Sequence, residues 1–112
     1  MEETLEMAKL LRQLEEMTKE LKTRGIKRAE AEKNYKVALN KEALRMKVEL
    51  VYPVTLIDKV VHGSEAVAEL RFKRDVAEST YNCTLEEINY IKTRIRVKEA
   101  EIKQDYAITK YQ

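Results

Sequence analysis

The residues with the greatest chemical potential in this sequence are few and lie far apart. His62 is the single histidine and Cys83 the single cysteine among 112 residues. Zinc sites need several Cys or His ligands at close spacing, and carboxylate-bridged di-iron sites need Glu-x-x-His pairs. The sequence contains neither pattern, and it lacks glycine-rich phosphate loops and nucleophile motifs. We therefore interpret His62 as a turn residue and Cys83 as a small buried apolar residue. We expect no enzyme activity, no metal and no cofactor.

A second kind of chemistry, contact with phosphate groups, is suggested by two basic clusters. Their members are Lys22, Arg24, Lys27, Arg28, Lys92, Arg94 and Arg96. Carboxylates are interleaved with both clusters, and 22 Lys and Arg face 20 Asp and Glu, for a net charge of +2. Nucleic-acid-binding domains usually concentrate a larger basic excess on one face. We therefore favour a solvated charged surface, with weak phosphate contact as the alternative.

The elements that must position these residues are long helices. Hydrophobic content of 44%, charged content of 38%, two glycines and one proline are typical of a coiled coil. Apolar residues recur at steps of three and four on both sides of a short interruption around Pro53 and Gly63. The pattern predicts one all-α domain over 1–112, a long antiparallel helical hairpin resembling a coiled coil. Its helices should span about 3–51, 55–61 at the tip, and 65–110.

Local signals refine these bounds. Pro53 should end the first helix near Val51, because proline disfavours helical geometry in the residue before it. Thr55 and Asp58 resemble a capping box for the short helix, and Gly63 should close that helix in a left-handed conformation. Gly25 either breaks the first helix or lies within it. We favour continuity, because the amphipathic phase survives across Gly25, where a glycine would also let the facing helix approach closely.

Aligning the two apolar seams predicts a register for the hairpin. It places Leu50 opposite Val67, Leu39 opposite Ala77, Tyr35 opposite Tyr81, and Leu14 opposite Ile102. The same register allows Arg74 to meet Glu42. We interpret the charged seam residues Arg28, Glu32 and Arg74 as devices that restrict the alignment of the helices.

Further apolar residues lie off this seam. They are Val37, Leu44, Val48 and Val51 in the first helix and Phe72, Val76, Cys83, Tyr90 and Val97 in the last. In the predicted register the two sets lie opposite one another. An exposed apolar stripe of that length usually marks an interface. We therefore expect a homo-oligomer, with a dimer favoured, in a four-helix arrangement. In the alternative, the tip covers the stripe or the exposure is simply tolerated.

The tip holds more apolar residues than a chain reversal requires. They are Val51, Val54, Leu56, Ile57, Val60 and Val61. These residues either cap the end of the hairpin or dock against another chain.

Three segments together resemble a known kind of protein: RGIKRAEAEKNYKVAL (24–39), YPVTLIDKVVHG (52–63) and VAELRFKRDVAESTY (67–81). They resemble small helical, coiled-coil hairpin proteins of phages and prophages of low-GC Gram-positive bacteria. The resemblance implies a non-enzymatic protein encoded among early replication and recombination functions, and it transfers no functional residues.

These observations favour a non-catalytic interaction or assembly protein that self-associates and binds a macromolecular partner. The alternative is a nucleic-acid-binding accessory protein of phage replication or recombination. No apolar run approaches the length of a membrane span, and no signal peptide is evident. We therefore expect a cytoplasmic location, in the host cell if the protein is phage-encoded, and no membrane contact.

Overall fold

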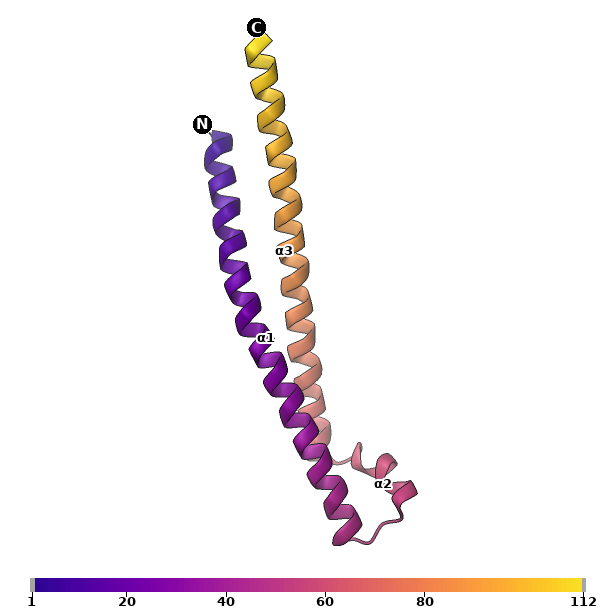
Figure 1. Cartoon of the computed structure of the whole chain (residues 1–112). Coiled ribbons are helices and arrows are strands. Elements are labelled where there is room, and N and C mark those ends of the chain that lie inside the picture. The colour runs from indigo at the N-terminus through magenta and orange to yellow at the C-terminus, as the bar shows by residue number, and fades with distance from the viewer. Residues whose placement is uncertain (1, 112) are drawn as a thin grey trace. The chain divides into compact units, whose positions relative to one another are not determined.

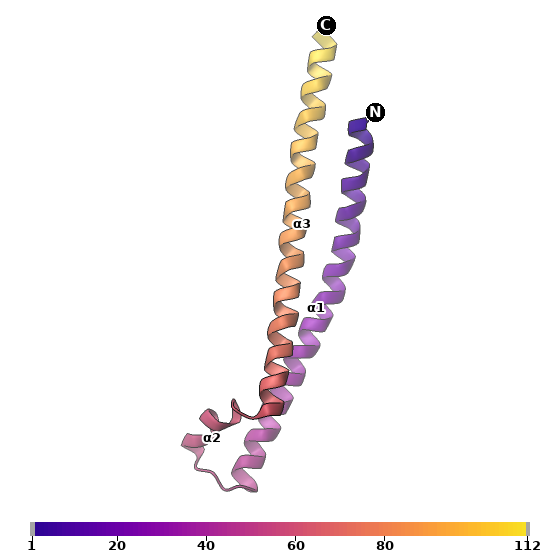
Figure 2. The ribbon, with the colours of Figure 1, turned by 180° about the vertical axis from the view of Figure 1, so that it is seen from behind.

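The computed structural model describes residues 2–111, which form three helices. These are α1 (Glu2–Val48), α2 (Val54–Val61) and α3 (Glu65–Tyr111) (Figure 1). The segments of α1 and α3 run antiparallel, side by side in both views (Figures 1 and 2). The predicted all-α helical hairpin is therefore confirmed.

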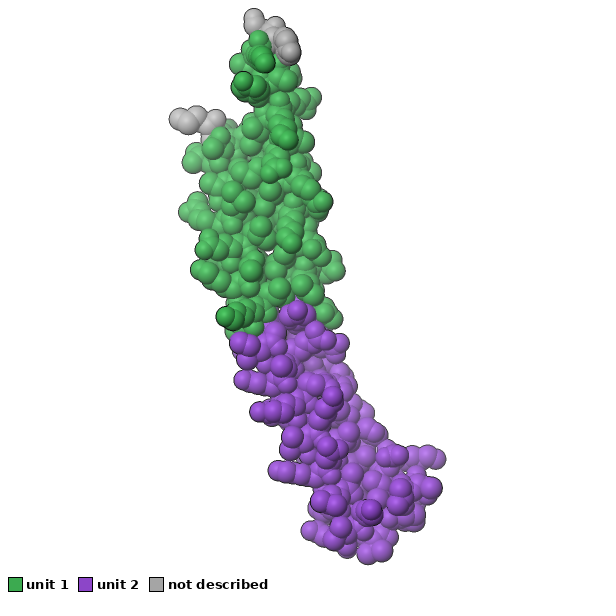
Figure 3. All heavy atoms as spheres, viewed as in Figure 1, with its two compact units in different colours: residues 1–23, 82–112 green, residues 24–81 purple. Residues whose placement is uncertain are grey.

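The chain divides into two compact units, coloured separately in Figure 3. Unit 1 comprises Met1–Thr23 with Asn82–Gln112, and unit 2 comprises Arg24–Tyr81. Each unit therefore contains one segment of α1 and one of α3, and unit 2 also contains α2.

Helix α1 is continuous through Gly25, as favoured from the amphipathic phase. Tyr81 of α3 packs over this glycine, where an added Cβ would lie 3.4 Å from Tyr81 Cε2. Gly25 thus allows the close approach of the facing helix. Acidic residues in the first turn of α1, and Arg45 and Lys47 in its last turn, complement the helix dipole.

Helix α1 ends at Val48, three residues before the predicted end at Val51. Val51 has a φ of 56°, a left-handed conformation that is rare for a β-branched residue. This geometry lets the Tyr52 N–H donate to the Met46 carbonyl oxygen at 3.0 Å, while the Glu49 N–H donates to the Arg45 carbonyl oxygen at 2.8 Å. Helix α1 therefore ends before the restriction that Pro53 imposes on Tyr52 applies.

Two predictions about the ends of α2 are wrong. Pro53, not Thr55, is its N-cap residue, with φ −57° and ψ 141° and no side-chain capping bond. The extended ψ of Pro53 places the N-cap two residues earlier than the capping box suggested. Gly63 has no positive φ. Instead the Gly63 N–H donates to the Val60 carbonyl oxygen at 3.0 Å, so a tight 3₁₀-type turn closes α2 without a left-handed residue.

Unit 2 has a compact apolar core because α2 folds back onto the hairpin. Ile57 and Val61 of α2 pack in one cluster with Tyr35 and Met46 of α1 and Val67 of α3. Val67 is only 1% exposed. The core therefore joins three helices.

The predicted register of α1 and α3 is wrong by about three helical turns. Arg74 contacts Glu32 and Tyr35 rather than Glu42. The last turns of α1 pack against α2, so α3 begins beside an earlier part of α1. The prediction treated the tip as a symmetric reversal and did not allow for α2 beside the end of α1.

Unit 1 is a simple pair of antiparallel segments. Its buried residues are Leu10 of α1 and Thr84, Ile88 and Ile91 of α3. Gln13 and Met17 line one groove with Tyr90 and Ile91, so Leu14 is not opposite Ile102 as predicted. The same displacement of register therefore applies within this unit.

Candidate interaction surfaces

The two residues with the most reactive side chains stand apart in the structure. His62 follows directly after α2 and is exposed, as expected for a turn residue. Cys83 is also exposed on α3, so the prediction of a buried cysteine is wrong for the single chain. Among the described residues, no group of three His, Cys, Asp or Glu side chains lies close enough to hold a metal ion.

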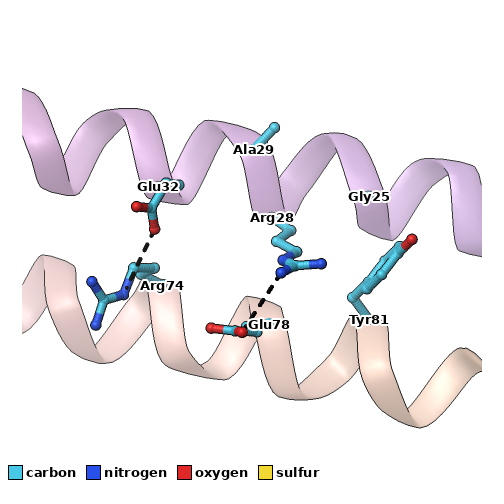
Figure 4. Close-up of a pocket in the computed structure, with 7 residues that line it drawn as sticks. All are labelled: Gly25, Arg28, Ala29, Glu32, Arg74, Glu78 and Tyr81. Carbon is cyan, nitrogen blue, oxygen red and sulfur yellow. Dashed lines mark ion pairs between the residues drawn. The ribbon is translucent and has the colours of Figure 1, made fainter.

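A groove of about 580 Å³ in unit 2 brings charged side chains of α1 and α3 together. It is lined by Gly25, Arg28, Ala29, Glu32, Arg74, Glu78 and Tyr81 (Figure 4). Arg28 Nη2 lies 3.6 Å from Glu78 Oε1, and Arg74 Nε lies 3.8 Å from Glu32 Oε2. The two ion pairs have opposite polarity along the seam, which disfavours sliding one helix along the other.

Two tyrosines complete this charged layer. The Arg74 guanidinium lies 4.4 Å from the centre of the Tyr35 ring, and Arg28 lies 5.0 Å from the centre of the Tyr81 ring. Arg74 also donates to Asp75 Oδ1 at 3.0 and 3.1 Å, and this hydrogen bonding raises the pKa of Arg74. Sequence analysis missed both tyrosine contacts because it used the wrong register. The charges lining the groove interact with one another, so the groove is best explained as a register-setting layer.

Unit 1 has its own interhelical charge cluster around Lys98. Lys98 Nζ lies 2.5 Å from Glu6 Oε2 and 3.0 Å from Glu101 Oε2. These hydrogen bonds raise the pKa of Lys98 above its ordinary value and, through Lys98, lower the pKa of the Glu6 carboxyl. Nearby, a hydrogen bond with Asp105 raises the pKa of Glu3. Lys98 therefore ties α3 to the start of α1.

The predicted phosphate-contact residues are divided between the two units. Lys22, Lys27, Lys92, Arg94 and Arg96 are exposed, whereas Arg24 and Arg28 are partly buried. Arg94 lines a groove with Glu6, Lys9, Leu10 and Gln13 of unit 1. Arg28 lies in the charged layer of unit 2. The predicted register placed the cluster of residues 22–28 beside that of residues 92–96. That register is wrong, so phosphate binding stays a prediction that the alignment of the helices no longer supports.

All residues of the predicted self-association stripe are exposed, but they lie on separate faces. Val37 and Leu44 each lie two residues from a buried residue of α1, Tyr35 or Met46, which is about 200° around the helix. They therefore face away from α3. Tyr90 instead borders the seam, because it lines a groove with Gln13 and Met17 of α1 although its side chain is exposed. The prediction that the two sets lie opposite one another is wrong, because Val37 and Leu44 face away from α3.

The densest group of exposed apolar side chains lies at the tip of unit 2. We call it the tip surface, and it comprises Leu44, Val48, Leu50, Val51, Tyr52, Val54, Leu56 and Val60. Ile57 and Val61 are buried in the core, as the interpretation of the tip as a cap requires, whereas Val54 and Leu56 face solvent. Docking of the tip against another chain stays a prediction. Leu50 and Tyr52 were missed. Both residues precede Pro53, and nothing in the sequence pattern there predicts that their side chains are exposed.

Comparisons of this chain with protein-family models, curated proteins and solved structures find no match to any of them. Within residues 2–111, no helix combines the length and apolar character needed to cross a membrane.

Proposed function

We propose that this protein is a non-catalytic helical interaction module, of a phage type, that self-associates and binds a macromolecular partner. The observation that carries the proposal is the tip surface, where eight large apolar side chains are exposed within residues 44–60. Monomeric proteins rarely expose contiguous apolar patches larger than a few hundred Å², and larger ones usually mark interaction sites.

The grooves of the protein support binding rather than catalysis. Catalytic sites usually combine an apolar pocket with convergent polar groups whose pKa values are perturbed. In the groove of unit 2 that contains Gly25, Arg28 and Arg74 interact with Glu78 and Glu32 across the seam. These groups serve the packing of the two helices, and they are not arranged around a position for a reacting atom.

Sedimentation equilibrium of the full chain over a wide micromolar range tests the proposal. We expect a mass above 13.2 kDa that rises with concentration. A mass of 13.2 kDa at every concentration would contradict self-association. A parallel titration with duplex DNA at low salt should show no binding. Affinity for DNA that falls steeply with added salt would favour the nucleic-acid-binding alternative.

A further inference from the structure

We infer that the tip surface pairs with the tip surface of a second copy of this chain in a two-fold symmetric contact. The inference rests on the proposed function and deepens it by naming the surface that self-associates. The outer face of α3 then remains available for other partners.

The tip surface differs from the other exposed apolar faces in its density. Four of its members, Leu50, Val51, Tyr52 and Val54, surround Pro53. Along α3, by contrast, Val76, Cys83, Tyr90 and Val97 are spaced seven residues apart, and polar side chains separate them. Interfaces derive most of their binding energy from a compact cluster of side chains, and the exposed apolar residues of the tip lie closer together in the sequence than those of α3.

The backbone of the tip holds one of these apolar side chains toward solvent. Val51 adopts a left-handed conformation that is rare for a β-branched residue, and this conformation lets the Tyr52 N–H donate to the Met46 carbonyl oxygen at 3.0 Å. The Val51 side chain is 77% exposed, so it does not contribute to the core of unit 2. It is therefore available for a contact between copies.

The tip combines a hollow with a neighbouring exposed side chain. The hollow of about 490 Å³ is lined by the apolar residues Met46, Leu50, Tyr52 and Val60 and by the charged residues Glu42, Arg45 and Lys59. The neighbouring Val54 is 69% exposed and begins α2. In a two-fold contact the same patch meets itself, so an apolar projection of one copy can enter the hollow of the other.

The charge of the tip favours a second copy over polyanionic partners. Residues 41–65 contain four basic and four acidic side chains, which leave no net charge. Arg45 also pairs with Glu42 within this region, at 2.6 Å, and lowers the pKa of the Glu42 carboxyl. A neutral patch can approach an identical patch without net repulsion, whereas nucleic acids and anionic membranes attract basic surfaces.

The experiment compares two matched double variants by sedimentation equilibrium, with circular dichroism to confirm helix content. Val54→Glu with Leu56→Lys alters the tip surface. Phe72→Glu with Val76→Lys alters the outer face of α3. Each pair replaces two exposed apolar residues of unit 2 and leaves the net charge unchanged. We expect the tip variant to weaken dimerisation at least about 100-fold, because its charges would be buried without partners. The α3 variant should change it less than about threefold.

A third variant, Val51→Glu, changes a residue outside the helices. It therefore tests the tip surface without altering α2, whose folding the first tip variant could disturb. It should weaken dimerisation at least about tenfold. If the wild type dimerises and the tip variants dimerise equally well, the inference is overturned while self-association stands. A wild type that stays at 13.2 kDa overturns both. If such a monomer binds phosphatidylcholine vesicles, and the tip variants do not, the tip serves a lipid surface instead.

Discussion

Units 1 and 2 are built from segments of the same two helices, yet they bury their apolar residues differently. Unit 1 pairs α1 with α3 alone, and its core is a single line that includes Leu10, Ile88 and Ile91. Unit 2 adds α2, and five buried residues from three helices form one cluster. Nevertheless, twelve of the eighteen large apolar residues found exposed in the described chain belong to unit 2. Unit 2, whose core joins three helices, therefore also exposes more large apolar side chains than unit 1 does.

Apolar residues of unit 2 therefore fall into two groups, those that form the core and those that face solvent. Ile57 and Val61 of α2 stabilise the fold, while Val54 and Leu56 of the same short helix add nothing to the core. An eight-residue helix is too short to be stable alone and depends on packing. Once α2 is docked through Ile57 and Val61, it holds a second apolar face toward solvent. Unit 1 lacks such an element.

The largest expected effect compares the cores directly. Ile57 and Ile88 are 7% and 6% exposed in units 2 and 1, so replacing each by alanine removes the same atoms from similarly buried sites. We expect Ile57→Ala to lower the free energy of unfolding by about 3 kcal/mol and Ile88→Ala by about 2 kcal/mol. Three packed helices can collapse around a cavity less readily than two. Urea unfolding at one fixed protein concentration measures both, and a larger loss for Ile88→Ala would reverse the comparison.

A gain of stability is expected from Gly25→Ala in unit 2. Alanine favours the helix interior over glycine by about 1 kcal/mol. The new Cβ would lie at ordinary contact distance from Tyr81, 3.4 Å from its Cε2 atom. The midpoint of urea unfolding should therefore rise. A fall would mean that Tyr81 packs more tightly on the α1 backbone than described.

Charge reversals in the charged layer of unit 2 test the register of α1 and α3. Glu78→Arg should lower stability by about 0.5–1 kcal/mol, because the Arg28–Glu78 pair is replaced by repulsion between half-exposed groups. Adding Arg28→Glu should recover about half of that loss, since the contact of Arg28 with Tyr81 is not restored. A double variant no more stable than Glu78→Arg would argue that Arg28 and Glu78 do not face each other.

The smallest expected effect concerns pH and unit 1. Lys98 lowers the pKa of Glu6 below its ordinary value of 4.5, so the contact stabilises the protein above that pH. The stabilisation is lost as the pH falls through the lowered pKa, because protonated Glu6 no longer pairs with Lys98. The difference in Tm between wild type and Glu6→Gln should therefore shrink below pH 4.5. A difference independent of pH would exclude the charge of Glu6 as its cause.

The helices themselves were predictable because their signals are local. Periodicity placed α3 within one residue at each end, and continuity through Gly25 followed from the amphipathic phase. The end of α1 was missed by three residues, since no local rule predicts a left-handed Val51. Gly63 was misassigned because glycine permits a positive φ but does not require one.

The candidate surfaces were only partly predictable because they depend on the register. Seam periodicity repeats every three or four residues, so several alignments of α1 and α3 match apolar positions equally well. The docking of α2 through Ile57 and Val61, a tertiary contact, selects among them. The exposure of Val51, Tyr90 and the rest of the predicted stripe could be predicted because these residues lie off the apolar seam. The placement of these residues on separate faces could not be predicted, because it depends on the register.

Hydrogen exchange measured below and above the concentration at which the chain associates tests the central claim most directly. If the tip surface is the self-association interface, amides of residues 49–62 should exchange more slowly at high concentration. Amides of unit 1, including those around Tyr90, should exchange at the same rate at both concentrations. Slower exchange confined to unit 1, or along the outer face of α3 without the tip, would contradict the claim.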